Sequence, residues 1–348
     1  MAEPLLKVSD LSVDYLSGRS PAKAVDRVNL RLDAGEFLAV VGESGCGKST
    51  LLFSIAHLLS APATVVGGTV SFRGRNMVRL TDKELRAVRW RGLSVVMQSA
   101  MNALNPVMSI RAQFEDVLRA HGQTNKEKNR TRSREVLALV GIDPVHLSSY
   151  PHQLSGGMRQ RAMIAMALLF SPELILMDEP TSALDVVAQR SLMVQVKQLQ
   201  AKLGFAVIFV THDMSLVSHF ADRVVVMYAG QVVEARPTRP LFEDPLHPYT
   251  RGLLDAFPSV YGPRLPLEGI PGSPPDLSAL PAGCNFYPRC PKVMPECPAT
   301  EPELYSVDGA EVRCLLYSGT GRHPTSDATG LPAAGLPAST DGPQVTNG

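Results

Sequence analysis

Residues 42–50 read Gly-Glu-Ser-Gly-Cys-Gly-Lys-Ser-Thr, which is a complete match to the phosphate-loop pattern G-x-x-x-x-G-K-[ST]. In this pattern small residues let backbone N–H groups curl around an anion, and the lysine, here Lys48, adds a positive charge. The apolar run 37–41 precedes the loop, and the helix-compatible stretch 50–56 follows it. The strand–loop–helix order that a phosphate loop requires is present, so these residues predict an α/β core that binds a nucleoside triphosphate.

Individual loop residues have separate expected roles. The hydroxyl of Ser49 is expected to face Mg²⁺. For Cys46 we favour a small space-filling side chain, and a thiol whose pKa is lowered by Lys48 is the alternative. The residues of the loop that we expect to contact the nucleotide are Gly42, Ser44, Gly45, Cys46, Gly47, Lys48, Ser49 and Thr50.

Composition narrows the class of protein. The chain has 348 residues, 45% of them hydrophobic, which is enough for one large core and a further unit. Its 34 basic and 33 acidic residues leave a formal charge of +1, which gives no general attraction to nucleic acid or anionic lipid. No apolar run approaches the roughly 18 residues of a membrane-spanning helix, and Met-Ala-Glu-Pro at 1–4 begins neither a signal peptide nor a lipidation site. We expect a cytosolic protein that meets membranes through a protein partner and has no nucleic-acid partner.

The remaining pattern surrounds the loop with strands and helices. Alternating apolar residues over 5–32 predict antiparallel strands. Helical spacing over 110–140, with a break at 122–125, predicts a helical insertion within one α/β core. Helices and buried strands alternate over 157–210, and a hairpin follows at 224–234, so we expect a largely parallel sheet.

After the core, proline becomes frequent. We expect residues 236–317 to form a C-terminal extension held by docking and staples more than by regular strand pairing. Residues 318–348 are rich in Gly, Pro, Ala, Ser and Thr and predict a disordered tail.

Two adjacent carboxylates follow the apolar run 174–177. Asp178, at the end of a buried strand, is placed to hold Mg²⁺, and Glu179 is the natural general base for an attacking water. His212 follows the buried strand 206–210 and is expected to contact the γ-phosphate and orient that water. An acidic strand end that caps the next element is the alternative for the carboxylate pair.

A second glycine-rich segment, Leu154-Ser155-Gly156-Gly157-Met158, directly precedes a helical pattern. The free N–H groups and the positive helix end at Ser155, Gly156 and Gly157 form a second anion site. One ATP rarely needs both sites of a single chain, so we expect a head-to-tail dimer that clamps each nucleotide between two subunits. Tyr15 is expected to stack on adenine, with simple strand packing as the alternative.

The order of these motifs resembles the nucleotide-binding subunit of ATP-binding-cassette (ABC) transporters over about residues 5–235. The resemblance implies a P-loop NTPase fold of the ABC type in a domain 1–235, with an antiparallel β subdomain, a helical insertion at about 99–160, and ATP and Mg²⁺ as cofactors. It also implies that Gln98 is a sensor that contacts Mg²⁺ together with Ser49 and Asp178. Met158 departs from the commoner glutamine at the end of the signature. The residues that carry the resemblance are Tyr15, 42–50, Gln98, 154–158, 178–179, 182–185 and His212.

Three further segments, 98–108, 246–254 and 270–275, look like those of the dipeptide/oligopeptide importer ATPases. That resemblance implies an ATPase, peripheral at the cytoplasmic face of the inner membrane, that energises uptake of di- and oligopeptides. Its implied partners are a homologous second ATPase, two transmembrane permeases and, indirectly, an extracytoplasmic peptide-binding protein. Nickel importers of the same family are an alternative. A soluble cassette ATPase acting on nucleic acid or ribosomes is a rival of another class.

Four of the five cysteines lie in the extension, at Cys284, Cys290, Cys297 and Cys314. Disulfides are disfavoured in a reducing cytosol, which leaves a metal centre or four unlinked thiols. Zinc sites usually contain a C-x₂₋₄-C knuckle, which is missing, whereas an iron–sulfur cluster accepts wider loops. The family resemblance implies a [4Fe–4S] cluster with a structural role. Zinc and unliganded thiols are the alternatives, and redox sensing is the alternative role.

Overall fold

A computed structural model describes residues 3–16, 20–98, 103–256 and 269–319 of the 348-residue chain. The segment 318–348, expected to be a disordered tail, lies outside the described residues except for its first two positions. Residues 99–102, which follow Gln98, also lie outside them.

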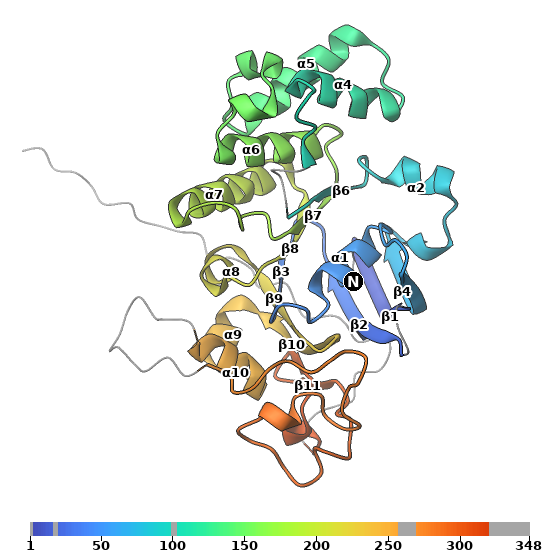
Figure 1. Ribbon diagram of the computed structural model, residues 1–348, viewed down its shortest axis with the longest axis vertical. Helices are drawn as coiled ribbons and strands as arrows, with labels where there is room; N and C mark the ends of the chain where they lie inside the picture. The colour runs from blue at the N-terminus through green and yellow to red at the C-terminus, as the bar shows by residue number, and fades with distance from the viewer. Residues whose placement is uncertain (1–2, 17–19, 99–102, 257–268, 320–348) are drawn as a thin grey trace, which may run out of the picture.

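A sheet of eight strands forms the centre of the molecule (Figure 1). Its strand β3, Phe37–Val41, pairs in parallel with β8, Ala206–Val210, on one side and with β9, Arg223–Tyr228, on the other. Beyond β8, the parallel part continues through β7, Leu174–Asp178, to β6, Leu93–Val96. Every residue of β3, β7 and β8 is buried, as expected for strands covered on both faces. The predicted parallel sheet is confirmed.

The two faces of this sheet belong to two hydrophobic clusters, because successive side chains of a strand point to opposite sides. Phe37 and Ala39 pack in the cluster on the helix-covered face, whereas Leu38 and Val40 pack in the cluster shared with a second sheet. The central strands therefore join both halves of the core.

The second sheet has four antiparallel strands and lies to the right of the first in Figure 1. Helix α1, Lys48–Ile55, contributes Leu51 and Leu52 to the cluster between the two sheets. This arrangement matches the antiparallel β subdomain expected from the sequence. In spatial order the strands are β2 Ala22–Leu32, β1 Leu6–Tyr15, β4 Ala63–Phe72 and β5 Arg75–Asn76.

Helices cover the other face of the large sheet and extend above it as the helical insertion (Figure 1). Polar caps set where they begin, as at Thr81 and Glu84, which form a capping box at the start of α2. The α-helices between the two ends of the core are α2 Asp82–Val88, α4 Ile110–Ala120, α5 Lys126–Leu139, α6 Gly156–Ala167, α7 Val186–Leu203 and α8 Met214–Phe220. Short 3₁₀ helices are η1 Met77–Arg79, η2 Pro144–Ser148, η3 Pro151–Gln153, η4 Tyr287–Arg289 and η5 Leu315–Tyr317.

The C-terminal extension is more regular than its proline content predicted. It contains α9 Thr238–Glu243 and α10 Pro248–Asp255, and the fixed φ of Pro248 suits the first position of α10. Strand β12, Ala310–Val312, pairs with β10, Gln231–Pro237, which itself pairs with β9 in the expected hairpin. The short β11, Tyr305–Val307, completes the order β11-β12-β10-β9-β3-β8-β7-β6. Strand pairing, and not docking alone, joins the extension to the core.

Candidate functional site

The phosphate loop lies between β3 and α1, as the sequence predicts. The Nζ of Lys48 donates to the carbonyl oxygens of Gly42 and Glu43, both at 2.8 Å, and so closes the loop. Gly47 has a φ of 103°, and a Cβ there would lie 1.9 Å from the carbonyl oxygen of Ala24. Ser44 and Gly45 are exposed. The chain therefore has a loop whose tip is open and whose base accepts only glycine.

Two other expected residues flank the loop. The hydroxyl of Tyr15, at the end of β1, lies 3.3 Å from Oγ1 of Thr50. Cys46 is buried, and burial raises the pKa of its thiol, although Lys48 opposes the rise. The alternative of a lowered pKa is thus wrong, and the space-filling interpretation of Cys46 agrees with the structure.

The carboxylates at the end of β7 lie beside the loop. The hydroxyl of Ser49 donates to Oδ1 of Asp178 at 2.8 Å. Burial is the largest cause that raises the pKa of Asp178, and the bond from Ser49 opposes it. This hydroxyl and carboxylate are oxygen ligands of the type that Mg²⁺ prefers.

The side chain of Glu179, the next residue, lies between those of Gln98 and His212. Glu179 has a φ of 42°, unusual for a residue other than glycine. Its carboxylate accepts a bond from Nε2 of Gln98 at 2.9 Å and lies 3.3 Å from Nδ1 of His212. Gln98 therefore contacts the carboxylate expected to act as base, and its contact with Mg²⁺ stays a prediction. The site brings Ser49, Asp178, Glu179, Gln98 and His212 together.

The Ser-Gly-Gly segment lies at the start of α6, as predicted. The hydroxyl of Ser155 accepts the N–H of Met158 at 3.2 Å and caps the helix. Gly156 and Gly157 are partly exposed, and a Cβ at Gly157 would meet no atom of the described residues within 4 Å. Within the described ranges, no hydrogen bond or ion pair joins these residues to the phosphate loop. Ser155 and Gly157 line a hollow of about 200 Å³ together with Leu184 and Ala188.

The four cysteines of the extension lie close enough for their thiols to interact electrostatically, and they form no disulfide. Burial, followed by the electrostatic effect of the three other thiols, raises the pKa of Cys314 to about 12. Backbone N–H groups point at the sulfurs: that of Lys292 donates to Cys290 and that of Met294 to Cys297, both at 3.4 Å. N–H groups likewise lower the pKa of Cys284 and Cys314 against the effect of burial; they belong to Phe286, Tyr287 and Leu316.

Over the described part of the chain, no group of three or more His, Cys, Asp or Glu side chains is arranged to hold a metal ion. The metal centre expected at Cys284, Cys290, Cys297 and Cys314 therefore gains no direct support from this geometry.

Another contact connects this cysteine segment to the phosphate loop and was not anticipated. The guanidinium of Arg289 makes an ion pair with the carboxylate of Glu43, with N–O distances of 2.7 and 2.9 Å. Arg289 lies inside the segment that the cysteines marked, but its partner is 246 positions away. Local pattern carries no signal for such a pair.

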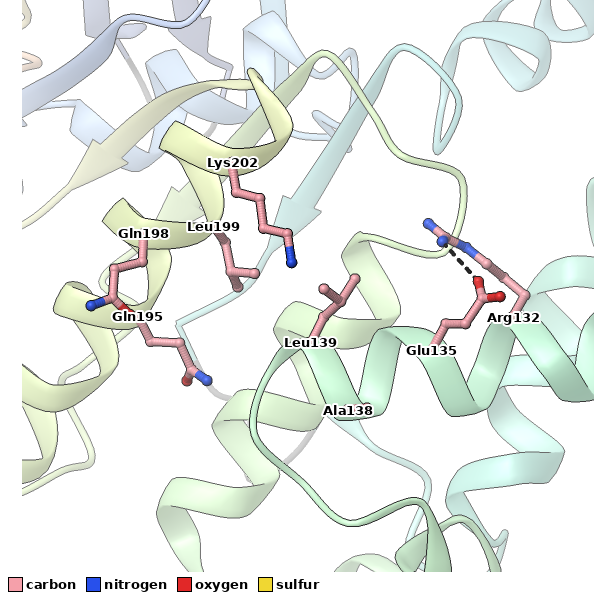
Figure 2. A pocket seen from close by; sticks show the side chains of 8 residues that line it. All are labelled: Arg132, Glu135, Ala138, Leu139, Gln195, Gln198, Leu199 and Lys202. Carbon is pink, nitrogen blue, oxygen red and sulfur yellow. Dashed lines mark hydrogen bonds and ion pairs between the residues drawn. The ribbon is translucent and has the colours of Figure 1, made fainter.

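A separate groove lies between α5 and α7 (Figure 2). Arg132 and Glu135 form an ion pair of 3.4 Å on one side of it, and Lys202 extends from the opposite helix. None of the residues expected to contact ATP lines this groove. The groove is therefore separate from the site formed by the residues expected to bind the nucleotide.

Comparison with protein families agrees with this geometry. Residues 25–182 match the ABC transporter family model, and residues 233–297 match the model described as "Oligopeptide/dipeptide transporter, C-terminal region". The chain is similar to the oligopeptide transport ATP-binding protein AppD of Bacillus subtilis, with 41% identity over 321 residues that cover 91% of this chain and 98% of AppD. It is also 41% identical to the dipeptide transport ATP-binding protein DppD of the same species, over 92% of this chain and 97% of DppD.

Solved structures give the same result for the core. A dimeric ATP-binding cassette, MJ0796, in a post-hydrolysis state bound to ADP and Pi is 32% identical and has a TM-score of 0.60, covering 67% of this chain and 99% of that one. The cassette cbiO1 of Clostridium perfringens, part of the transporter complex cbiONQ, is 28% identical with a TM-score of 0.60, over 70% of this chain and 92% of that one.

The fold and the site thus define an ABC-type ATPase with a P-loop NTPase core. In the part of the chain that the structure describes, no helix has the length and apolar character needed to span a bilayer. With relatives of about 40% identity along nearly its whole length, the chain belongs to the ATP-binding subunits of ABC transporters, in the family that carries the oligopeptide/dipeptide transporter C-terminal region.

Proposed function

We propose that this subunit hydrolyses ATP to drive import of di- and oligopeptides through a membrane permease. The family match over 233–297 and the names of AppD and DppD support peptide over nickel as cargo. The alternative of a soluble ATPase acting on nucleic acid has no such support from these relatives.

One observation carries the catalytic part of this proposal. Glu179 lies between Gln98 and His212, one residue after the Asp178 carboxylate that binds Ser49 of the phosphate loop. Glu179 would accept a proton from the attacking water, and His212 would orient that water toward the γ-phosphate.

The binding residues follow from the same geometry. Lys48 and the loop N–H groups would hold the phosphates, and the Nζ that binds two loop carbonyls would donate to the anion instead. Ser49 and Asp178 fit Mg²⁺, which supplies charge compensation when bound, and Gln98 would approach it with the bound nucleotide. Tyr15 would stack on adenine beside Thr50.

Ser155, Gly156 and Gly157 would complete the site of a second subunit. Their exposure, and the dimeric state of the MJ0796 cassette, support a head-to-tail pair. We propose a homologous second ATPase as partner, two transmembrane permeases above the pair, and a peptide-binding protein outside the cell. This arrangement makes the chain peripheral at the cytoplasmic face of the inner membrane.

The chain would divide into a nucleotide-binding domain 1–235, with its helical insertion at about 99–160, an extension 236–317 and a tail 318–348. We further propose that Cys284, Cys290, Cys297 and Cys314 hold a [4Fe–4S] cluster. The N–H groups directed at the sulfurs suit thiolate ligands, since such bonds stabilise negative charge on sulfur. When bound, the cluster would add four Fe–S bonds that pin the extension.

Reconstitution tests the transport proposal. The subunit, its second ATPase and the permeases in proteoliposomes should take up peptide only with ATP and the peptide-binding protein present. Uptake of Ni²⁺ instead of peptide under the same conditions would overturn the choice of cargo.

Metal analysis after anaerobic purification tests the cluster. About four irons per chain with broad visible absorption would support it. One zinc and no colour would make the extension a zinc-stapled unit, and no metal would leave four free thiols.

A further inference from the structure

The phosphate loop of this protein has a contact that the ATPase chemistry does not explain. Glu43, the second residue of the loop, is bound at three points. Its backbone N–H donates to the hydroxyl of Tyr249 at 2.8 Å, and its carbonyl oxygen accepts a bond from Nζ of Lys48 at 2.8 Å. Its carboxylate accepts two hydrogen bonds from the guanidinium of Arg289. Two of these three partners belong to the C-terminal extension.

Arg289 is itself held rigidly by its own segment. Its side chain is only 6% exposed, and its Nε donates to the carbonyl oxygen of Pro271 at 2.7 Å. Its guanidinium also lies over the ring of Tyr228, 5.8 Å from the centroid. Glu43 raises the pKa of Arg289 further, so its charge is permanent. An arginine fixed by backbone carbonyls positions the carboxylate that it binds, because its planar fork allows one geometry.

Three aromatic residues next to the Arg289–Glu43 pair pack the extension against the core. Tyr228 at the end of β9, Tyr249 of α10 and Phe286 of the cysteine segment contact one another, with ring centroids 4.6 to 5.4 Å apart. Tyr228 and Tyr249 are almost fully buried. Packed side chains therefore join the cysteine segment to Arg289 and Tyr249, and these two residues contact the loop.

The charge of Glu43 matters because the loop must receive a polyanion. An unpaired carboxylate on a phosphate-binding loop repels the nucleotide phosphates, and the repulsion is strong at a partly buried position. Glu43 is about one quarter exposed, so solvent screens it incompletely. Pairing with Arg289 removes this net negative charge from the mouth of the site.

We propose that Arg289 is a positioning residue for ATP binding: it neutralises and orients Glu43, and thereby makes the affinity of the phosphate loop depend on the docked cysteine-containing extension. The extension then acts on the nucleotide site from within its own subunit. This role is separate from the cargo and from any metal held by the cysteines.

The test compares three full-length variants for equilibrium binding of MgATP and for thermal stability. Arg289→Gln should weaken MgATP binding about tenfold, since it leaves Glu43 unpaired. The double variant Arg289→Gln with Glu43→Gln should recover binding to within about threefold of the parent, because the repelling charge is gone. Arg239→Gln, which breaks an exposed ion pair with Glu243 in the same extension, is the matched control and should bind like the parent.

The steady-state rate separates positioning from loss of structure. In the assembled transporter, Arg289→Gln should raise the KM for ATP about tenfold with kcat changed less than twofold, because Glu179 and His212 are untouched. Unchanged MgATP affinity in Arg289→Gln, whatever its melting temperature, would overturn the proposal. So would a double variant as weak as Arg289→Gln, since the loss would then not act through the charge of Glu43. A parent chain that binds no MgATP would instead contradict the ATPase assignment itself.

Discussion

The two glycine-rich segments of this chain have opposite relations to their surroundings. In the phosphate loop, Gly47 has a backbone conformation and a neighbour, Ala24, that exclude any side chain. In the Ser-Gly-Gly segment, Gly157 has open space where its Cβ would be. Glycine at the first position is required by this subunit, whereas no contact within the described residues requires glycine at the second. This difference agrees with the proposal that a second subunit approaches the Ser-Gly-Gly segment.

Replacing the carboxylate of Glu179, beside the phosphate loop, should have the largest effect on ATP hydrolysis. Glu179→Gln keeps the shape that Gln98 and His212 contact but removes the base. We expect ATP hydrolysis to fall by about 10² to 10⁴, while ATP binding persists. Single-turnover hydrolysis and equilibrium binding measure the two quantities. Hydrolysis at the parental rate would remove Glu179 from its role.

A methyl group added to the phosphate loop should lower the stability and the ATP binding of the isolated subunit, without any partner being involved. In Gly47→Ala the added carbon would lie 1.9 Å from the carbonyl oxygen of Ala24, at a φ of 103°. We expect a loss of more than about 2 kcal/mol in the free energy of unfolding and failure of the isolated chain to bind ATP. Denaturant unfolding and binding assays test this. Gly45→Ala, at an open position, is the control for a mere loss of glycine, although its φ of 80° adds some strain.

As the pH falls, the surroundings of the phosphate loop should be destabilised at a higher pH than those of the Ser-Gly-Gly segment. His247 is fully buried beside Phe286, and burial lowers its pKa to about 3. Its Nδ1 accepts the N–H of Tyr249, the residue that binds Glu43. Because the folded state resists protonation, stability is complete above pH 6.5 and is lost as pH falls toward 3, at about 1.4 kcal/mol per unit.

Melting temperatures and MgATP affinities between pH 7 and pH 5 measure this loss, which should reach about 2 kcal/mol at pH 5. His247→Gln lacks the titrating group and should have a flatter acid limb. If parent and variant have the same pH dependence, His247 does not link the extension to the loop.

A methyl group added to the Ser-Gly-Gly segment should have the smallest effect on the stability of the subunit. It should raise that stability, whereas a methyl group at Gly47 should lower it. Gly157→Ala removes a flexible residue from the first turn of α6, so we expect the chain to gain about 0.5–1 kcal/mol in stability and to bind ATP as before. Hydrolysis by the assembled pair should still fall at least about tenfold, since the closing surface is altered. Normal hydrolysis in the pair would show that no second subunit approaches Gly157 closely.

Prediction from sequence succeeded where the signal is local. The phosphate loop, the pair Asp178 and Glu179, and the capped start of α6 are each encoded within a few residues. The Glu43–Arg289 pair could not be found this way, because its members meet only after the extension folds back on β9 and β10.

The extension was also predicted less well for a physical reason. Its strands β11 and β12 are only three residues long and follow a proline-rich stretch, so their alternation is too short to recognise. The contact of Gln98 with Glu179 is a further feature that a local pattern does not signal, because the two residues are 81 positions apart in the chain.

The hairpin of β11 and β12 also has a consequence for solubility. Without it, β10 would be the outermost strand of the large sheet and would present unpaired backbone groups, an edge on which other chains can add by strand pairing. The hairpin pairs with Glu234 and Ala235 of this edge and leaves the three-residue β11 outermost, which is too short to template aggregation well. A chain shortened to its nucleotide-binding domain at residue 235 should therefore self-associate, even with every residue of the nucleotide site intact.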